Sequence, residues 1–68
     1  MAKSLAQRPL DRVVREPERR TITQVSRVQW WRMEATGEAP RRIKIGVKSV
    51  GWSENELLAW IADRMAAR

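Results

Sequence analysis

Apolar and polar residues follow two different periods along the chain, and the change of period predicts the elements of the fold. Residues 17–22, 26–36 and 53–68 have helical spacing, whereas residues 41–52 alternate with a period of two. A short strand at residues 12–15 precedes the first helix. Residues 1–11 carry Lys3 and Arg8 without periodicity, which indicates a flexible basic arm that either contacts phosphate or a minor groove or is simply a frayed terminus. The pattern predicts a single small α+β domain, mainly α, over residues 12–68.

The first predicted helix, residues 17–22, starts well but has a weak apolar face. Pro17 suits the first helical position, and Glu18 complements the positive end of the helix dipole. Arg19 and Arg20 occupy the middle of the segment. Ile22 is therefore the clear core candidate of this helix.

The second predicted helix, residues 26–36, has the strongest boundary signals. Ser26 can cap it while the Gln29 side chain reaches back to the cap amide, and Val25 can staple onto the helix. Gly37 can adopt the left-handed conformation that ends a helix. At about 100° per residue, Trp30 and Met33 share one face, which we expect to be core. The opposite face carries Val28, Trp31, Arg32 and Ala35, with Arg27 and Gln29 at its flanks.

An outward Trp31 beside an outward Val28 would be a costly surface unless a partner covers it. We interpret the partner as duplex DNA. Arg27 and Arg32 can bind base edges or phosphates, Gln29 suits adenine, and Val28 can touch a thymine methyl. The alternative is that Trp31 packs on the hairpin or on a neighbouring protomer and that the arginines are solvated.

The alternating segment, residues 41–52, predicts a β-hairpin with its tip at residues 46–49. We expect the apolar side chains of both strands to point inward, namely Ile43, Ile45, Val50 and Trp52. The intervening cations then face solvent or phosphate. The segment from 41 to 48 holds four cations and no acid: Arg41, Arg42, Lys44 and Lys48. A charged edge can also serve only to prevent aggregation, but the neighbouring helix favours DNA contact.

The last predicted helix opens at residues 53–56 with a second capping box. Its apolar stripe comprises Leu57, Leu58, Ile61 and Met65, with Trp60 at the border. We expect this stripe and Trp52 to close the core, so that the helix is scaffold.

Composition narrows the choice of partner. The 68 residues hold 14 Lys and Arg against 8 Asp and Glu, a formal charge of +6, and the isoelectric point is near 11.4. Such a chain prefers polyanions, and its preference for arginine over lysine suits bidentate recognition of guanine and phosphate. A basic surface without a partner, or an RNA or ribosomal contact, is the alternative.

Several classes of function are disfavoured. The chain has no Cys and no His, which excludes disulfides, Cys/His metal sites, and thiol or imidazole catalysis. We expect no cofactor and no enzymatic activity. Apolar runs are far shorter than the roughly 20 residues that span a bilayer, and the start lacks a signal-peptide core. We therefore expect a cytoplasmic, nucleoid-associated protein without a membrane partner.

A series of short motifs resembles AlpA-type phage and prophage regulators. They are Thr23-Gln24-Val25-Ser26-Arg27, Trp30-Trp31-Arg32, Gly37-x-x-Pro40-x-x-Ile43-Lys44-Ile45-Gly46, Ser49-Val50-Gly51-Trp52 and Ala59-Trp60-Ile61. The resemblance runs without gaps from Val13 and implies a winged helix-turn-helix of the excisionase and MerR-like group. It implies a second helix starting at Ser26 and a wing over residues 42–52.

The resemblance also implies residue roles. By position, the DNA-facing set would be Arg27, Gln29, Trp31 and Arg32, and the core would hold Trp30, Ile43, Val50, Trp52, Trp60 and Ile61. Two positions depart from the family pattern. Arg19 stands where an apolar residue is usual, and Gln24 replaces a turn glycine, so the resemblance does not determine the packing of the first helix or the tightness of the turn.

We expect a sequence-specific double-stranded DNA-binding protein of a phage or mobile element. The family implies an excisionase, also called a recombination directionality factor, that bends attachment-site DNA, or a transcriptional regulator that acts on an integrase gene, and the two roles can coexist in one chain. Further copies on adjacent sites, an integrase or another regulatory protein are the expected partners. The alternatives are an RNA-binding basic domain and a protein-interaction antirepressor anchored by Trp31.

Overall fold

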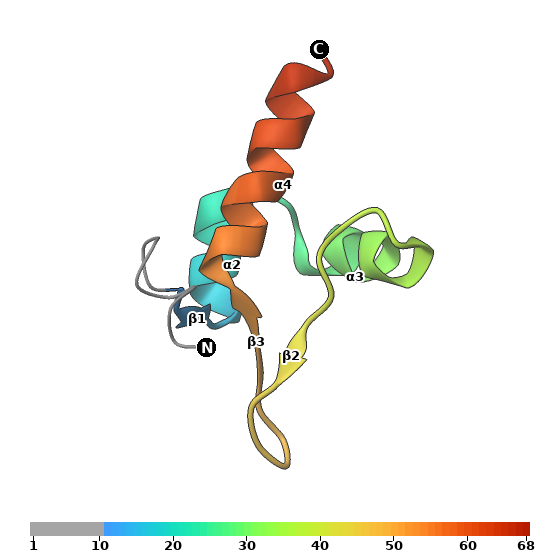
Figure 1. The fold of residues 1–68 in the computed structure, drawn as a ribbon. Coiled ribbons are helices and arrows are strands. Elements are labelled where there is room, and N and C mark those ends of the chain that lie inside the picture. Colours follow the sequence, from blue (N-terminus) through green and yellow to red (C-terminus); the bar gives the residue numbers. More distant parts are fainter. Residues whose placement is uncertain (1–10) are drawn as a thin grey trace.

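The computed structural model describes residues 11–68, and the predicted N-terminal arm, apart from Asp11, lies outside the described residues. The order of elements is β1 (Val13–Val14), α2 (Glu16–Thr23), α3 (Arg27–Thr36), β2 (Ile43–Lys44), β3 (Val50–Ser53) and α4 (Glu54–Ala66). Figure 1 shows the β2–β3 hairpin extending away from α4, with α3 to one side. This is the predicted α+β, mainly helical fold of a winged helix-turn-helix.

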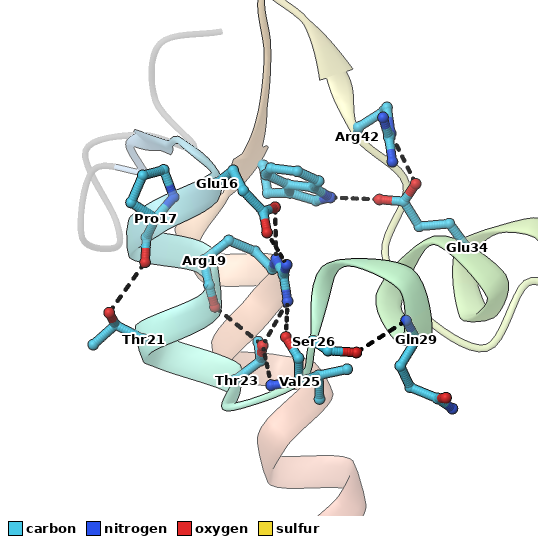
Figure 2. Close-up of polar contacts among 11 residues, drawn as sticks. Glu16, Pro17, Arg19, Thr21, Thr23, Val25, Ser26, Gln29, Glu34 and Arg42 are labelled. Carbon is cyan, nitrogen blue, oxygen red and sulfur yellow. Dashed lines mark hydrogen bonds and ion pairs between the residues drawn. The ribbon is translucent and has the colours of Figure 1, made fainter.

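The helix boundaries follow from local capping. Ser26 Oγ accepts a hydrogen bond from the Gln29 amide at 3.2 Å, and Ser53 Oγ accepts one from the Glu56 amide at 3.1 Å. Gly37 ends α3 with a φ of 82°. The hydroxyl caps at Ser26 and Ser53 and the helix end at Gly37 are confirmed, but within residues 11–68 the Glu56 side chain makes no hydrogen bond back to Ser53. Within the same residues, the Gln29 side chain likewise makes no bond back to Ser26 and points away from it (Figure 2), so only the hydroxyl half of that capping box forms.

Gln24 occupies the sharp turn between α2 and α3. Its φ of 59° lies in the left-handed region, which costs a residue with a side chain roughly 1–2 kcal/mol. The Gln24 amide donates to the Arg20 carbonyl at 2.7 Å, and its side-chain Nε2 donates to the Thr21 carbonyl at 2.8 Å. The two hydrogen bonds hold a conformation that glycine would adopt without strain.

The sheet has three antiparallel strands in the order β1-β3-β2. Val14 pairs with Trp52 on the buried face, and Ile43 pairs with Gly51 on the other. Directly paired residues share a face, so Ile43 and Ile45 lie opposite the face of Trp52. They are 40% and 48% exposed. The prediction that both isoleucines point into the core was wrong, because the register offsets the apolar positions of the two strands.

The core is small and centred on tryptophan. Its buried apolar members are Val14, Trp30, Met33, Ala39, Trp52 and Leu57, and Ile22, Val25, Val50 and Trp60 pack against them. The Trp30 and Trp60 rings meet edge to face, with centroids 5.0 Å apart and an interplanar angle of 74°. The predicted core face of α3 is confirmed.

Helix α4 buries less of its stripe than expected. Leu57 is fully buried, but Leu58 and Met65 are 50% and 55% exposed, while Trp60 at the border packs on the core. Figure 1 shows the C-terminal end of α4 extending past the other elements of the described chain. The predicted stripe was therefore wrong for Leu58 and Met65.

Arg19 is the unexpected member of the interior, with no exposed surface. It forms an ion pair with Glu16, and its Nη1 donates to the Val25 carbonyl at 2.7 Å (Figure 2). Its guanidinium carbon lies 5.0 Å from the Trp30 ring centre and 5.6 Å from that of Trp52. A paired, stacked cation thus occupies the position where the resemblance implied an apolar residue.

Candidate nucleic-acid interface

The outer face of α3 exposes the residues that the helical spacing placed there. Val28 and Trp31 are 59% and 60% exposed, so Trp31 does not pack inside its own monomer. The polar members of this face are also exposed: Arg27, Gln29 and Arg32. This face follows from the helical period, because Trp30 and Met33 turn the helix so that its other side meets solvent.

The wing presents Lys44 toward the same side. Lys44 pairs with Val50, so it shares the sheet face that carries Trp52. That face is turned toward α3, because Trp52 Nε1 donates to Glu34 Oε2 at 2.6 Å. Lys48 lies exposed in the tip between the strands. The register therefore places Lys44 on the side of the wing that faces α3.

Two hollows between α3 and the segment leading into β2 join these surfaces. One, of about 340 Å³, is lined by Trp31, Glu34, Ala35, Arg41 and Arg42. The other, of about 300 Å³, is lined by Arg27, Val28, Trp31 and Arg42. Trp31 and Arg42 border both. The structure thus brings five of the predicted site residues together, whereas Gln29, Arg32, Lys44 and Lys48 lie outside these linings.

Arg42 is not the free cation that the alternation indicated. Its Nε donates to Glu34 Oε1 at 2.9 Å (Figure 2), and its guanidinium carbon lies 5.6 Å from the Trp52 ring centre. Glu34 is 8% exposed and was missed in the sequence. The available signal was its position four residues after Trp30, which puts a carboxylate on the buried face of α3 and requires a partner there.

A larger hollow, of about 580 Å³, lies between α4 and the segment that follows α3. Its lining includes Glu38, Glu56 and Asp63 against one cation, Arg41. Excess negative charge repels phosphates, so the hollow is a poorer site for nucleic acid than the smaller ones beside Trp31.

Arg12 is already occupied by carboxylates. It forms an ion pair with Glu18, and its Nε lies 3.1 Å from Glu54 Oε1. The hydrogen bonds that Arg12 donates to Glu18 and Glu54 raise the pKa of Arg12, and the bonds that Glu18 accepts from Arg12 hold the pKa of Glu18 below its ordinary value. Arg12 therefore contributes less than the α3 and wing cations to an anion-binding surface.

Other kinds of site find little support in the part of the chain that the structure describes. No group of three or more His, Cys, Asp or Glu residues within 11–68 is arranged to hold a metal ion. None of the helices α2 to α4 has the length and apolar character needed to cross a membrane.

Comparisons with known proteins identify the family of this chain. The family model described as Prophage CP4-57 regulatory protein (AlpA) matches residues 12–65. Uncharacterized protein ORF88 of Enterobacteria phage P4 is 34% identical over 58 residues, covering 85% of this chain and 66% of that protein. The chain spans just under two thirds of the length of this relative. No solved structure matches the chain. Since the family match covers most of the described residues, the chain belongs to the AlpA family of phage regulatory proteins.

Proposed function

We propose that this protein binds specific sequences in double-stranded DNA of a phage or mobile element. In this proposal α3 enters the major groove and the wing lies along a flanking phosphate strand. The observation that carries it is the surface shared by α3 and the wing, where exposed Trp31 lies among Arg27, Arg41 and Arg42. A regulatory family and a net positive chain support the same partner.

In this proposal each side chain of α3 contacts the part of the DNA that suits its chemistry. Arg27 and Arg32 bind guanine edges or phosphates, Gln29 pairs with adenine, and Val28 contacts a thymine methyl. Arg41, Arg42, Lys44 and Lys48 bind the backbone, which sets the register of α3 on the duplex. Trp31 supplies apolar contact that excludes water between the arginines.

At the level of the mobile element, we propose that binding and bending regulate excision, transcription, or both, without catalysis. The protein works in the cytoplasm, where the element's DNA lies. A single α3 contacts few base pairs, so useful specificity requires several copies on adjacent sites. An integrase or another regulator is a further partner in this proposal.

The test is selection from a random duplex library, followed by footprinting on DNA of the element that carries the gene. Arg27→Ala and Arg32→Ala should abolish the preference for the selected duplex. Arg20→Ala is the matched control, because it removes an exposed cation from α2 and leaves the α3 surface intact. If about five cations contact phosphates, log affinity should fall with log salt at a slope near −4 to −5. Absence of duplex binding at low salt would refute the proposal.

A protein-interaction role is the second candidate, and the 60% exposure of Trp31 is the observation that favours it. In that case Trp31→Ala would break a protein complex and leave duplex binding unchanged. Competition with structured RNA tests the remaining alternative, a basic RNA-binding domain. In that case the RNA would displace the selected duplex from the protein.

A further inference from the structure

Arg42 is held by residues of two different elements. Its Nε donates to Glu34 Oε1 on α3, and its guanidinium lies over the ring of Trp52 on β3. Glu34 Oε2 accepts from Trp52 Nε1 at 2.6 Å. The three side chains therefore connect α3, the segment before β2, and β3 in one closed set of contacts.

A carboxylate is an unexpected component of a surface that binds phosphate. Glu34 lines the hollow beside Trp31, and its negative charge opposes a polyanion. It is also almost fully buried, which costs free energy unless its oxygens are paired. The role of Glu34 must therefore lie in positioning its two partners, Arg42 and Trp52.

The bond to Glu34 uses only the inner edge of the Arg42 guanidinium. Within residues 11–68, Nη1 and Nη2 of Arg42 make no hydrogen bond, and the side chain is about 40% exposed. Arg42 also borders both hollows next to Trp31. Its outer edge is thus presented beside the α3 surface in a fixed orientation.

We infer that Glu34 is a positioning residue for DNA discrimination. It fixes Arg42 so that the two Nη atoms bind a backbone phosphate at a set distance from the bases that α3 contacts. Phosphate contacts determine the register of a reading helix, so a loose Arg42 would let α3 shift relative to the bases. The inference rests on the proposed function and adds that specificity depends on a buried residue that does not touch DNA.

The test compares Glu34→Gln with Glu38→Gln. Both changes remove one negative charge, but Glu38 is exposed and its carboxylate forms no hydrogen bond or ion pair within residues 11–68. Affinity is measured for the duplex selected by the wild type and for a scrambled duplex of equal length. The ratio of the two affinities, selected over scrambled, measures discrimination. We expect Glu38→Gln to keep the wild-type ratio. Glu34→Gln should bind the scrambled duplex at least as well as the wild type but lose about tenfold in the ratio.

Arg42→Lys keeps the charge and tests the same link if Glu34→Gln unfolds. Lysine lacks the planar fork that binds Glu34 and phosphate at once, so the ratio should again fall about tenfold. The affinity ratio of the double variant, Glu34→Gln with Arg42→Lys, should fall no further than that of either single variant, because both changes remove the same link. In ethylation interference, modification of one flanking phosphate should inhibit binding of the variants less than binding of the wild type. The preference for the selected bases should be weaker.

The results separate the two ideas. If Glu34→Gln and Arg42→Lys both keep the wild-type ratio within about twofold, the inference is wrong and the proposed function stands. Equal losses of affinity for both duplexes in Glu34→Gln, together with lower thermal stability, would also overturn the inference. They would show that Glu34 only supports the fold. A wild-type protein that binds no duplex would refute the proposed function itself.

Discussion

The guanidinium carbon of Arg19 lies 5.0 Å from the centre of the Trp30 ring, so a buried cation of α2 stacks on the central aromatic side chain of α3. Cations at this distance are attracted to the face of the indole. Arg19 also donates to the Val25 carbonyl in the connection between the helices. The angle between α2 and α3 is therefore maintained by a polar residue inside an apolar core.

Replacing Arg19 by Ala should destabilise the domain by about 3–5 kcal/mol, because Glu16 and the Val25 carbonyl lose their partner. A core of this size supplies little more than that, so much of the protein should unfold. Urea unfolding monitored by Trp fluorescence measures the loss. Arg20→Ala should change stability by no more than about 0.5 kcal/mol. Comparable effects for the two arginines would contradict the buried role of Arg19.

Two buried tryptophans should respond differently to loss of the indole nitrogen. Trp52 Nε1 donates to Glu34, whereas Trp30 Nε1 is buried without a partner among residues 11–68. Trp52→Phe should therefore cost about 1–3 kcal/mol more than Trp30→Phe, since it leaves the buried Glu34 Oε2 without its donor while Arg42 still binds Oε1. Parallel thermal melts of both variants measure the difference. A Trp30→Phe variant at least as costly as Trp52→Phe would contradict this role of Trp52 Nε1.

Gly51 is a position where a methyl group has no room. A Cβ there would overlap Val13 Cγ1 and would lie 2.8 Å from both Ile45 Cδ1 and the Val14 carbonyl oxygen. Because backbone cannot yield cheaply, Gly51→Ala should cost about 1–3 kcal/mol.

The matched control is Gly46→Ala, since the nearest atom to a Cβ at Gly46 is Ser49 Cβ at 4.0 Å. Gly46→Ala should stay within about 0.5 kcal/mol of the wild type. Denaturant titrations of the two variants compare them, and a neutral Gly51→Ala would mean that the strand packing differs from that described.

Trp31→Ala should separate stability from binding. The side chain is 60% exposed, so its loss should change the free energy of unfolding by about 0.5 kcal/mol or less. If Trp31 lies at the centre of the DNA contact, affinity for the selected duplex should fall about tenfold or more. Fluorescence anisotropy gives the affinity and a thermal melt gives the stability. A large destabilisation would show that Trp31 is covered in the free protein.

The ion pair of Glu18 with Arg12 should make stability depend on pH. The pKa of Glu18 lies below its ordinary 4.5 in the folded protein, so the pair stabilises above that value. The stabilisation is lost as pH falls through the lowered pKa. The melting temperature of wild type should exceed that of Glu18→Gln near pH 7, and the gap should close below about pH 4.5.

Both side chains of this pair are about half exposed, so added salt should narrow the same gap. In an Arg12→Gln background, Glu18→Gln should have no such pH-dependent effect. A gap that is constant from pH 7 to pH 3 would contradict the role of Arg12.

Local chemistry made much of the fold predictable. Ser26, Ser53 and Gly37 act within a few residues of their own position, so a cap or a left-handed helix end can be inferred without knowing the rest of the chain. The outer face of α3 was predictable for the same reason, because a helical period assigns Trp31 to one side once Trp30 is assigned to the other.

Contacts between elements far apart in the sequence decided which apolar side chains of β2 and α4 are buried, and the sequence pattern did not reveal these contacts. The register that sets Ile43 opposite Gly51 depends on how two strands align, and a shift of one residue exchanges their faces. Leu58 fits an apolar stripe by spacing, but whether anything covers it depends on where α4 lies relative to the sheet.

By itself, the sequence determined the helices, their caps, the wing and the cationic α3 face, since each depends on neighbours along the chain. Only the tertiary structure decided that Arg19 is buried against Trp30 and that Glu34 holds Arg42. Charged side chains are placed inside a protein only by partners brought from other elements, and no periodicity along one segment reveals those partners.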